Sequence, residues 1–249
     1  RWNGAEWING AATTVSGGSG VDFYADDASI IATSTNNAIH VETLLKIPRT
    51  AVEQAEVVEA TTTDVSPKIV EAYLYGLDLN RLKMDAGTWG FNTYCSVNNN
   101  TSGTPRISRN VFRVLSGTGT LSTVGSGTSA TATQTVTTGL FAAGDASADI
   151  TLCGYLQTPQ GLYEITGYTS AKVVTIKILA TYSNETNIAA GSWRLWRKMF
   201  GTTTSEIPYV GTGYGLLSTQ SVQGEYTFTL TDRIGCIVFA SSTVSKTIN

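Results

Sequence analysis

The chain has 249 residues, of which 41% are hydrophobic and 14% are charged, and it is rich in Ser, Thr and Gly. This length and apolar content are sufficient for a hydrophobic core and exclude a fully disordered chain. The 16 basic and 19 acidic side chains give a net charge of -3, and no apolar run reaches the roughly 18 residues of a membrane span, so we expect neither nucleic acid binding nor membrane insertion.

The first segment, residues 1–29, consists mainly of small and polar residues with scattered aromatic side chains. It shows no sustained helical or strand period and has too few aliphatic residues for a core of its own. We therefore expect an attachment segment whose aromatic rings pack on the body of the protein or insert into a neighbouring subunit. The candidate assembly contacts are Trp2, Trp7, Phe23 and Tyr24.

The next part of the chain, up to residue 115, has the pattern of β-strands. Residues 30–48 alternate loosely between apolar and polar, which predicts a strand pair containing the only histidine, His40. Residues 51–60 fit either a short helix or a strand with outward-facing Glu side chains, and the sequence leaves this choice open. From residue 69 to residue 115, β-branched and aromatic residues separated by turn residues predict an antiparallel meander.

The composition changes at Ser116, where a Thr- and Gly-rich stretch begins. Three apolar runs separated by turns follow at the spacing of a small antiparallel barrel or sheet. We therefore interpret residues 116–192 as an inserted module, placed where RNVFRVL would otherwise form a hairpin with SWRLWRKMF. Residues 193–249 return to strands, and with residues 30–115 they are expected to form a β-sandwich.

The WRLWRK run gives a specific prediction for one tryptophan. Strand alternation places Arg194, Trp196 and Lys198 on one face, while Trp193 and Leu195 point toward the core. We expect Trp196 to lie on the surface, either between two cations or stacked on a sugar ring. Two further candidate surface or glycan contacts follow in a glycine-bearing connection, Tyr209 and Tyr214.

Motifs for catalysis are missing from the sequence. A Ser-His-Asp or Cys-His device would have to use His40, no GxSxG motif occurs, and the glycine-rich stretches lack GK[ST]. A carboxylate pair for glycoside cleavage depends on spatial rather than sequential spacing, so the sequence leaves it open. We expect four acids, Glu71, Asp78, Glu164 and Asp232, at sheet ends or solvent faces in structural roles. The sequence therefore predicts no enzyme and no cofactor.

The three cysteines, Cys95, Cys153 and Cys236, form no CxxC pair, and one histidine cannot complete a structural zinc site with them. Each cysteine lies in an apolar stretch, which indicates a buried thiol. A disulfide between Cys95 and Cys236 is the alternative. We expect no bound metal.

Two stretches resemble modules of tailed-bacteriophage virion proteins. The first has a Thr-rich strand, an "aGD" turn and a hairpin of the form G.Y.I.....S..VTI, and its matching residues are Gly144, Asp145, Gly161, Tyr163, Ile165, Ser170 and Val173 to Ile176. The second is similar to the jelly-roll sandwich of phage tail-fibre, head-fibre and decoration proteins, and its matching residues are Trp89, Phe91, Tyr94, Val97, Thr231, Asp232, Arg233 and Ile234. Together they cover most of residues 69–249.

The resemblance implies an all-β protein, an antiparallel jelly-roll-like sandwich with an inserted small β-barrel or β-sheet module. It also implies a non-enzymatic virion structural protein, located on the particle surface or tail and used for assembly and host attachment. Its partners would be other copies of itself, often as a trimer, other virion proteins and a host surface glycan. The alternative function is a carbohydrate-binding module that uses Trp196, Tyr209 or Tyr214.

Overall fold

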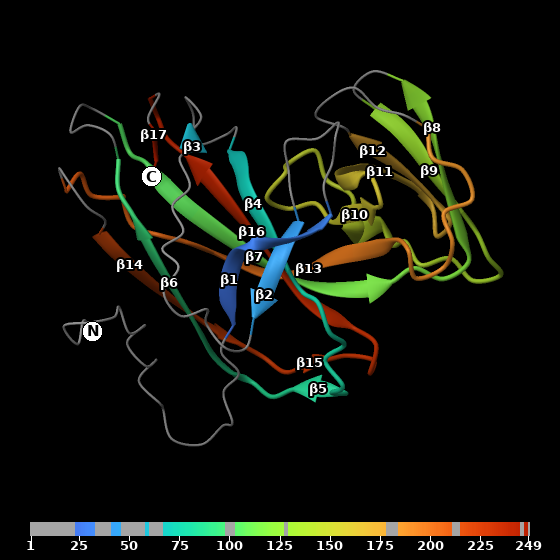
Figure 1. The fold of residues 1–249 in the computed structure, drawn as a ribbon, viewed down its shortest axis with the longest axis horizontal. Coiled ribbons are helices and arrows are strands. Elements are labelled where there is room, and N and C mark those ends of the chain that lie inside the picture. Colours follow the sequence, from blue (N-terminus) through green and yellow to red (C-terminus); the bar gives the residue numbers. More distant parts are fainter. Residues whose placement is uncertain are drawn as a thin grey trace.

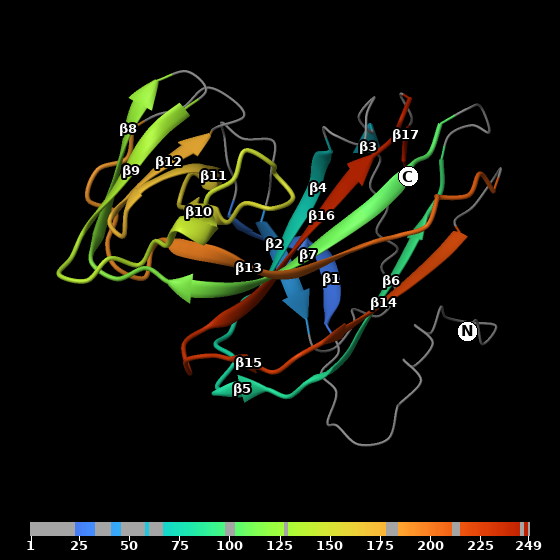
Figure 2. The same ribbon diagram turned by 180° about the vertical axis from the view of Figure 1, so that it is seen from behind.

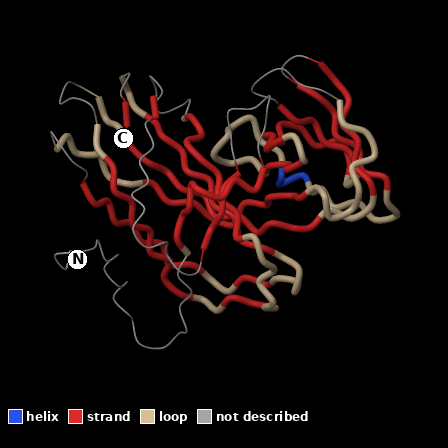
Figure 3. Tube along the Cα trace, viewed as in Figure 1, coloured by secondary structure: helices blue, strands red, loops and turns tan. Residues whose placement is uncertain are grey.

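The computed structural model describes residues 23–32, 41–45, 58–59, 67–97, 103–126, 129–177, 184–210, 215–244 and 247–248. Within these ranges the chain forms strands and turns, with one 3₁₀ turn, η1 (Ala143–Asp145), as helical structure (Figure 3). The segments rich in β-branched and aromatic residues are strands, because such side chains pack well on a pleated surface. The predicted all-β class is confirmed.

The strands in chain order are β1 (Tyr24–Ala32), β2 (Val41–Leu45), β3 (Val58–Glu59), β4 (Lys68–Tyr75), β5 (Lys83–Met84), β6 (Gly87–Cys95), β7 (Arg106–Ser116), β8 (Thr120–Ser126), β9 (Ser129–Thr135), β10 (Tyr155–Thr158), β11 (Gly161–Ser170), β12 (Val173–Lys177), β13 (Arg194–Thr203), β14 (Gly215–Gln223), β15 (Tyr226–Thr227), β16 (Arg233–Ser241) and β17 (Thr247–Ile248).

Eleven of these strands form one large sheet in the order β1-β2-β4-β16-β7-β13-β10-β11-β12-β9-β8 (Figure 1). Neighbouring strands are antiparallel, except that β2 runs parallel to β4. The central strand β7 pairs with β16 on one side and with β13 on the other. The β7–β13 pair is the hairpin partnership that the sequence predicted around the inserted residues.

Smaller sheets complete the fold: β14 pairs with β6, β15 with β5, and β17 with β3. The β6–β14 ribbon forms a second layer against the large sheet. Trp89 and Phe91 of β6 meet the ring of Phe200 on β13 edge-on, with ring centroids 5.1 and 6.3 Å apart. Tyr226 of β15 stacks on Phe200 at 6.0 Å. These aromatic contacts join the layers into a sandwich.

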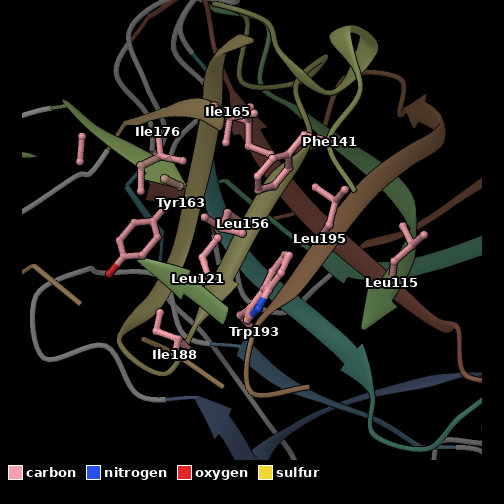
Figure 4. Packing of buried hydrophobic residues seen from close by; sticks show 13 residues of the cluster. Leu115, Leu121, Phe141, Leu156, Tyr163, Ile165, Ile176, Ile188, Trp193 and Leu195 are labelled. Atoms are coloured by element: carbon pink, nitrogen blue, oxygen red, sulfur yellow. The ribbon is translucent and has the colours of Figure 1, made fainter. Parts of the chain in front are cut away.

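Strands β8 to β12, from residues 120–177, lie at the end of the molecule opposite the β6–β14 ribbon (Figure 2). They surround a hydrophobic cluster that includes Trp193, Phe141 and Leu195 (Figure 4). The strand order runs from β13 to β8 without returning, so these strands form an open sheet rather than a closed barrel. Because β10 pairs with β13, the predicted module shares one sheet with its host. Its boundaries, residues 116–192, stay a prediction.

Of the segment left open between helix and strand, residues 58–59 lie in β3 and pair with β17. The rest of residues 51–60 lies outside the described residues, as does His40.

Candidate functional site

The four predicted assembly contacts fall in the amino-terminal part of the chain. Phe23 is half-buried and packs edge-on against Tyr75 of β4, with ring centroids 5.3 Å apart. Tyr24 begins β1 and pairs with Leu45 of β2. Trp2 and Trp7 lie outside the described residues. Phe23 therefore packs on the body of its own chain, and the strand that follows it belongs to the large sheet.

Trp196 is fully buried, so its predicted place on the surface is wrong. Its indole Nε1 donates a hydrogen bond to Gln157 Oε1 at 2.9 Å, and its ring meets that of Phe112 at 5.9 Å. The alternation along β13 holds, since Leu195 enters one hydrophobic cluster and Trp196 another. Both faces of the strand are covered at this point, so neither side is free for a sugar.

The two remaining candidate contacts lie after β13. Tyr209 is 48% exposed, as predicted for a surface residue. Tyr214 lies outside the described residues. Among the predicted glycan contacts whose side chains the structure describes, Tyr209 is thus the one that solvent reaches.

Three of the four acids that we expected at sheet ends or solvent faces are buried: Glu71, Glu164 and Asp232. The fourth, Asp78, is half-exposed and accepts a hydrogen bond from Arg233 Nε at 3.0 Å. The prediction that these acids lie at sheet ends or solvent faces was wrong for the three buried ones. Each of them gains a hydrogen-bond or ion-pair partner, which compensates for the loss of water on burial.

The partners of these acids come from other strands. Arg113 Nε donates to Asp232 Oδ2 at 2.7 Å, and Lys177 Nζ lies 3.3 Å from Glu164 Oε2. Glu71 accepts a hydrogen bond from the Tyr73 hydroxyl. The carboxylates are therefore bonded within the fold, as their predicted structural role requires.

Asp145, at the end of η1, makes the most complete of these pairs. Arg197 Nε donates to its Oδ1 at 2.7 Å, and Nη2 donates to its Oδ2 at 2.8 Å. The Ala142 N–H also donates to Oδ2, and Arg197 Nη2 reaches the Leu140 carbonyl at 3.0 Å. The hydrogen bonds to Asp145 raise the pKa of Arg197. The "aGD" turn singled out in the sequence is thus tied to β13.

A surface that the sequence analysis did not single out lies on the outer side of the β6–β14 ribbon. We call it the outer ribbon face, and its exposed residues are Thr88, Gly90, Asn92, Leu216, Ser218, Gln220 and Val222. Cross-strand pairs such as Thr88–Val222 and Asn92–Ser218 place them on one side. Val222 is 79% exposed and Leu216 53%. The face carries no charge, and the signal for it in the sequence was the alternation of large aromatic with small or polar residues along β6.

The three cysteines are free thiols, so the alternative Cys95–Cys236 disulfide is not formed. Burial raises the pKa of Cys95 to about 11 and those of Cys153 and Cys236 to about 12. Since the thiolate is the reactive and metal-binding form, these side chains act as small apolar groups at neutral pH.

The described ranges contain no cluster of three or more His, Cys, Asp or Glu residues suited to a metal ion. They also contain no helix with the length and apolar character to cross a membrane. The chain matches no protein family, no curated protein and no solved structure.

Proposed function

We propose that the protein is a non-enzymatic structural component of a bacteriophage virion, a tail-fibre, head-fibre or capsid-decoration protein that assembles with copies of itself and serves attachment. The observation that carries this proposal is the outer ribbon face. Its two exposed apolar side chains, Leu216 and Val222, are surrounded by uncharged residues. Such a surface can be buried against another protein without removing ions from water, which is the main cost of burying a charged face.

The paired carboxylates also support a scaffold. Asp145 and Asp232 are each held by an arginine within the fold. A carboxylate held in this way stabilises the connection between distant strands, whereas a general acid or base needs access to substrate. Asp145 and Asp232 are also among the residues that carry the resemblance to virion modules. The residues of the resemblance therefore include two that form ion pairs stabilising the sandwich.

A particle-level experiment tests the proposal. Antibodies raised against the purified protein should label intact phage particles in electron micrographs of the producing lysate. Protein that stays in the particle-free fraction, with unlabelled particles, would contradict the proposal.

Removal of residues 1–22 tests the attachment segment separately. This deletion retains Phe23 and β1, so we expect a folded protein by near-ultraviolet circular dichroism, together with lost incorporation into particles. Loss of folding would show that the segment belongs to the core, and normal incorporation would show that attachment lies elsewhere.

A carbohydrate-binding module is the second candidate, and the exposure of Tyr209 favours it. An exposed aromatic ring can stack on a sugar. A glycan array probed with the wild-type protein and with Tyr209→Ala distinguishes the two functions. Binding that disappears in the variant would support the module, and an array without signal would remove it.

A further inference from the structure

Arg109 of β7 is buried between the large sheet and the β6–β14 ribbon, with only 4% of its surface exposed. Its guanidinium donates hydrogen bonds to two hydroxyl groups of the ribbon, Thr93 Oγ1 and, at 3.4 Å, Thr219 Oγ1. It also lies over the ring of Phe91, 6.0 Å from the centroid. All three partners are uncharged, so they leave its positive charge uncompensated.

The other strongly bonded arginines of the sheet have carboxylate partners, as Arg113 has Asp232 and Arg197 has Asp145. Arg109 forms no such ion pair with any described residue. A carboxylate on the same face of the sheet, Glu71, is separated from Arg109 by Val238 of the intervening strand. Burial lowers the pKa of Arg109, but an arginine side chain stays protonated in proteins.

The two thiols that interact with this guanidinium, those of Cys95 and Cys236, do not supply the missing charge. Burial raises their pKa values to about 11 and about 12, so both are protonated at neutral pH. A buried cation without a counter-charge is strongly unfavourable, because it loses its hydration and gains no Coulomb attraction in return.

A second unsatisfied group lies beside Arg109. Thr202 of β13 is directly opposite Arg109 in the β7–β13 register, so both side chains lie on the same face. The Thr202 hydroxyl is buried and has no hydrogen-bond partner among the residues that the structure describes. The register therefore brings the Thr202 hydroxyl, with its unused O–H, to the side of the sheet on which the Arg109 guanidinium lies. One acceptor placed between them would satisfy both, and a negatively charged acceptor would also neutralise Arg109.

We propose that Arg109 and Thr202 bind a small monovalent anion, chloride in physiological solution, between the large sheet and the ribbon. A single charge matches the single uncompensated cation. The donors around it are one guanidinium and a few threonine hydroxyls, which suit a monatomic ion better than a phosphate with four oxygens to satisfy. The anion would bridge β7 and β13 under the ribbon and so stabilise the packing of the two layers.

Chloride titration of stability tests the site. Urea unfolding is followed as sodium chloride replaces sodium gluconate at constant ionic strength, so that general screening stays fixed. The wild-type midpoint should rise with chloride. Thr202→Val keeps the shape of the side chain but removes the O–H donor, and it should weaken the apparent chloride affinity roughly tenfold. Arg109→Met should abolish the dependence.

Arg106→Met is the matched control, since Arg106 is an exposed arginine on the same strand, and it should respond to chloride as the wild type does. Equal chloride dependence in wild type, Thr202→Val and Arg106→Met would contradict the site and indicate a general salt effect.

Bromide in crystals of the wild type gives an independent readout that does not need the Arg109 variant to fold. An anomalous peak between Arg109 and Thr202 is expected. Bromide peaks at other positions only would indicate an adventitious ion only and would overturn the proposal. The absence of any bromide peak would overturn it as well.

Discussion

Gly235 of β16 lies against the indole ring of Trp196 on β13, and a Cβ built on this glycine would come 2.4 Å from Cζ3 of the ring. The two strands are separated in the sheet by β7. The indole therefore reaches across β7 to the only kind of residue that leaves room for it. This contact fixes a large fully buried side chain at the centre of the sheet.

Gly235→Ala should therefore destabilise the protein by about 1–3 kcal/mol, because the added methyl forces the Trp196 ring or the strand to move. Gly76→Ala is the matched control: its Cβ would meet nothing within 4 Å, and it should change the free energy of unfolding by less than about 0.5 kcal/mol. Urea unfolding of both variants measures the difference. Equal effects would contradict the close packing.

Arg197→Met should cost about 3–5 kcal/mol, because it leaves the Asp145 carboxylate buried without its counter-charge. Exposed Arg106→Met should change the free energy of unfolding little. The same unfolding experiment compares the two arginines, and a small effect at Arg197 would show that the ion pair adds little to the fold.

Stability should fall as the pH rises from about 9. The thiols have raised pKa values in the folded state, about 11 for Cys95, so the unfolded chain loses these protons first. The contribution of the protonated thiol to folding stability is fully present at pH values below 9, the ordinary thiol pKa. It is lost as the pH rises toward the pKa of the thiol in the folded protein.

Unfolding at pH 8 and pH 10 measures this dependence, with Cys95→Ala as the comparison. The variant should lose less stability between the two pH values than the wild type, whatever its packing cost at pH 8. An identical loss would mean that Cys95 does not keep its proton in the folded state.

The strands were predictable because they depend on local composition. The β7–β13 pair could also be inferred, since the Thr-rich residues between the two segments differ in composition from both. The buried position of Trp196 could not be inferred from the sequence. Alternation shows which side chains share a face of a strand, but it does not show whether other residues cover that face. Coverage depends on residues such as Cys153 and Ile150, which join the same cluster from the turn before β10.

The buried acids were missed for a related reason. Arg197 is 52 residues from Asp145, and Arg113 is 119 residues from Asp232. A local pattern shows an acid as a polar residue suited to a solvent face, and only the folded topology brings the arginine that makes burial favourable. The burial of Arg109 could not be predicted from the sequence either. In this case the folded topology brings a covering layer, the β6–β14 ribbon, but no carboxylate partner among the described residues.

Sedimentation equilibrium tests most directly whether the outer ribbon face joins copies of this chain. The wild type should form a discrete oligomer, and Leu216→Glu/Val222→Glu should be a folded monomer, since each charge would have to be buried in the interface. Val124→Glu/Leu152→Glu, at exposed apolar residues away from the ribbon, should keep the wild-type mass. A monomeric wild type, or an oligomer that survives both ribbon substitutions, would contradict the account.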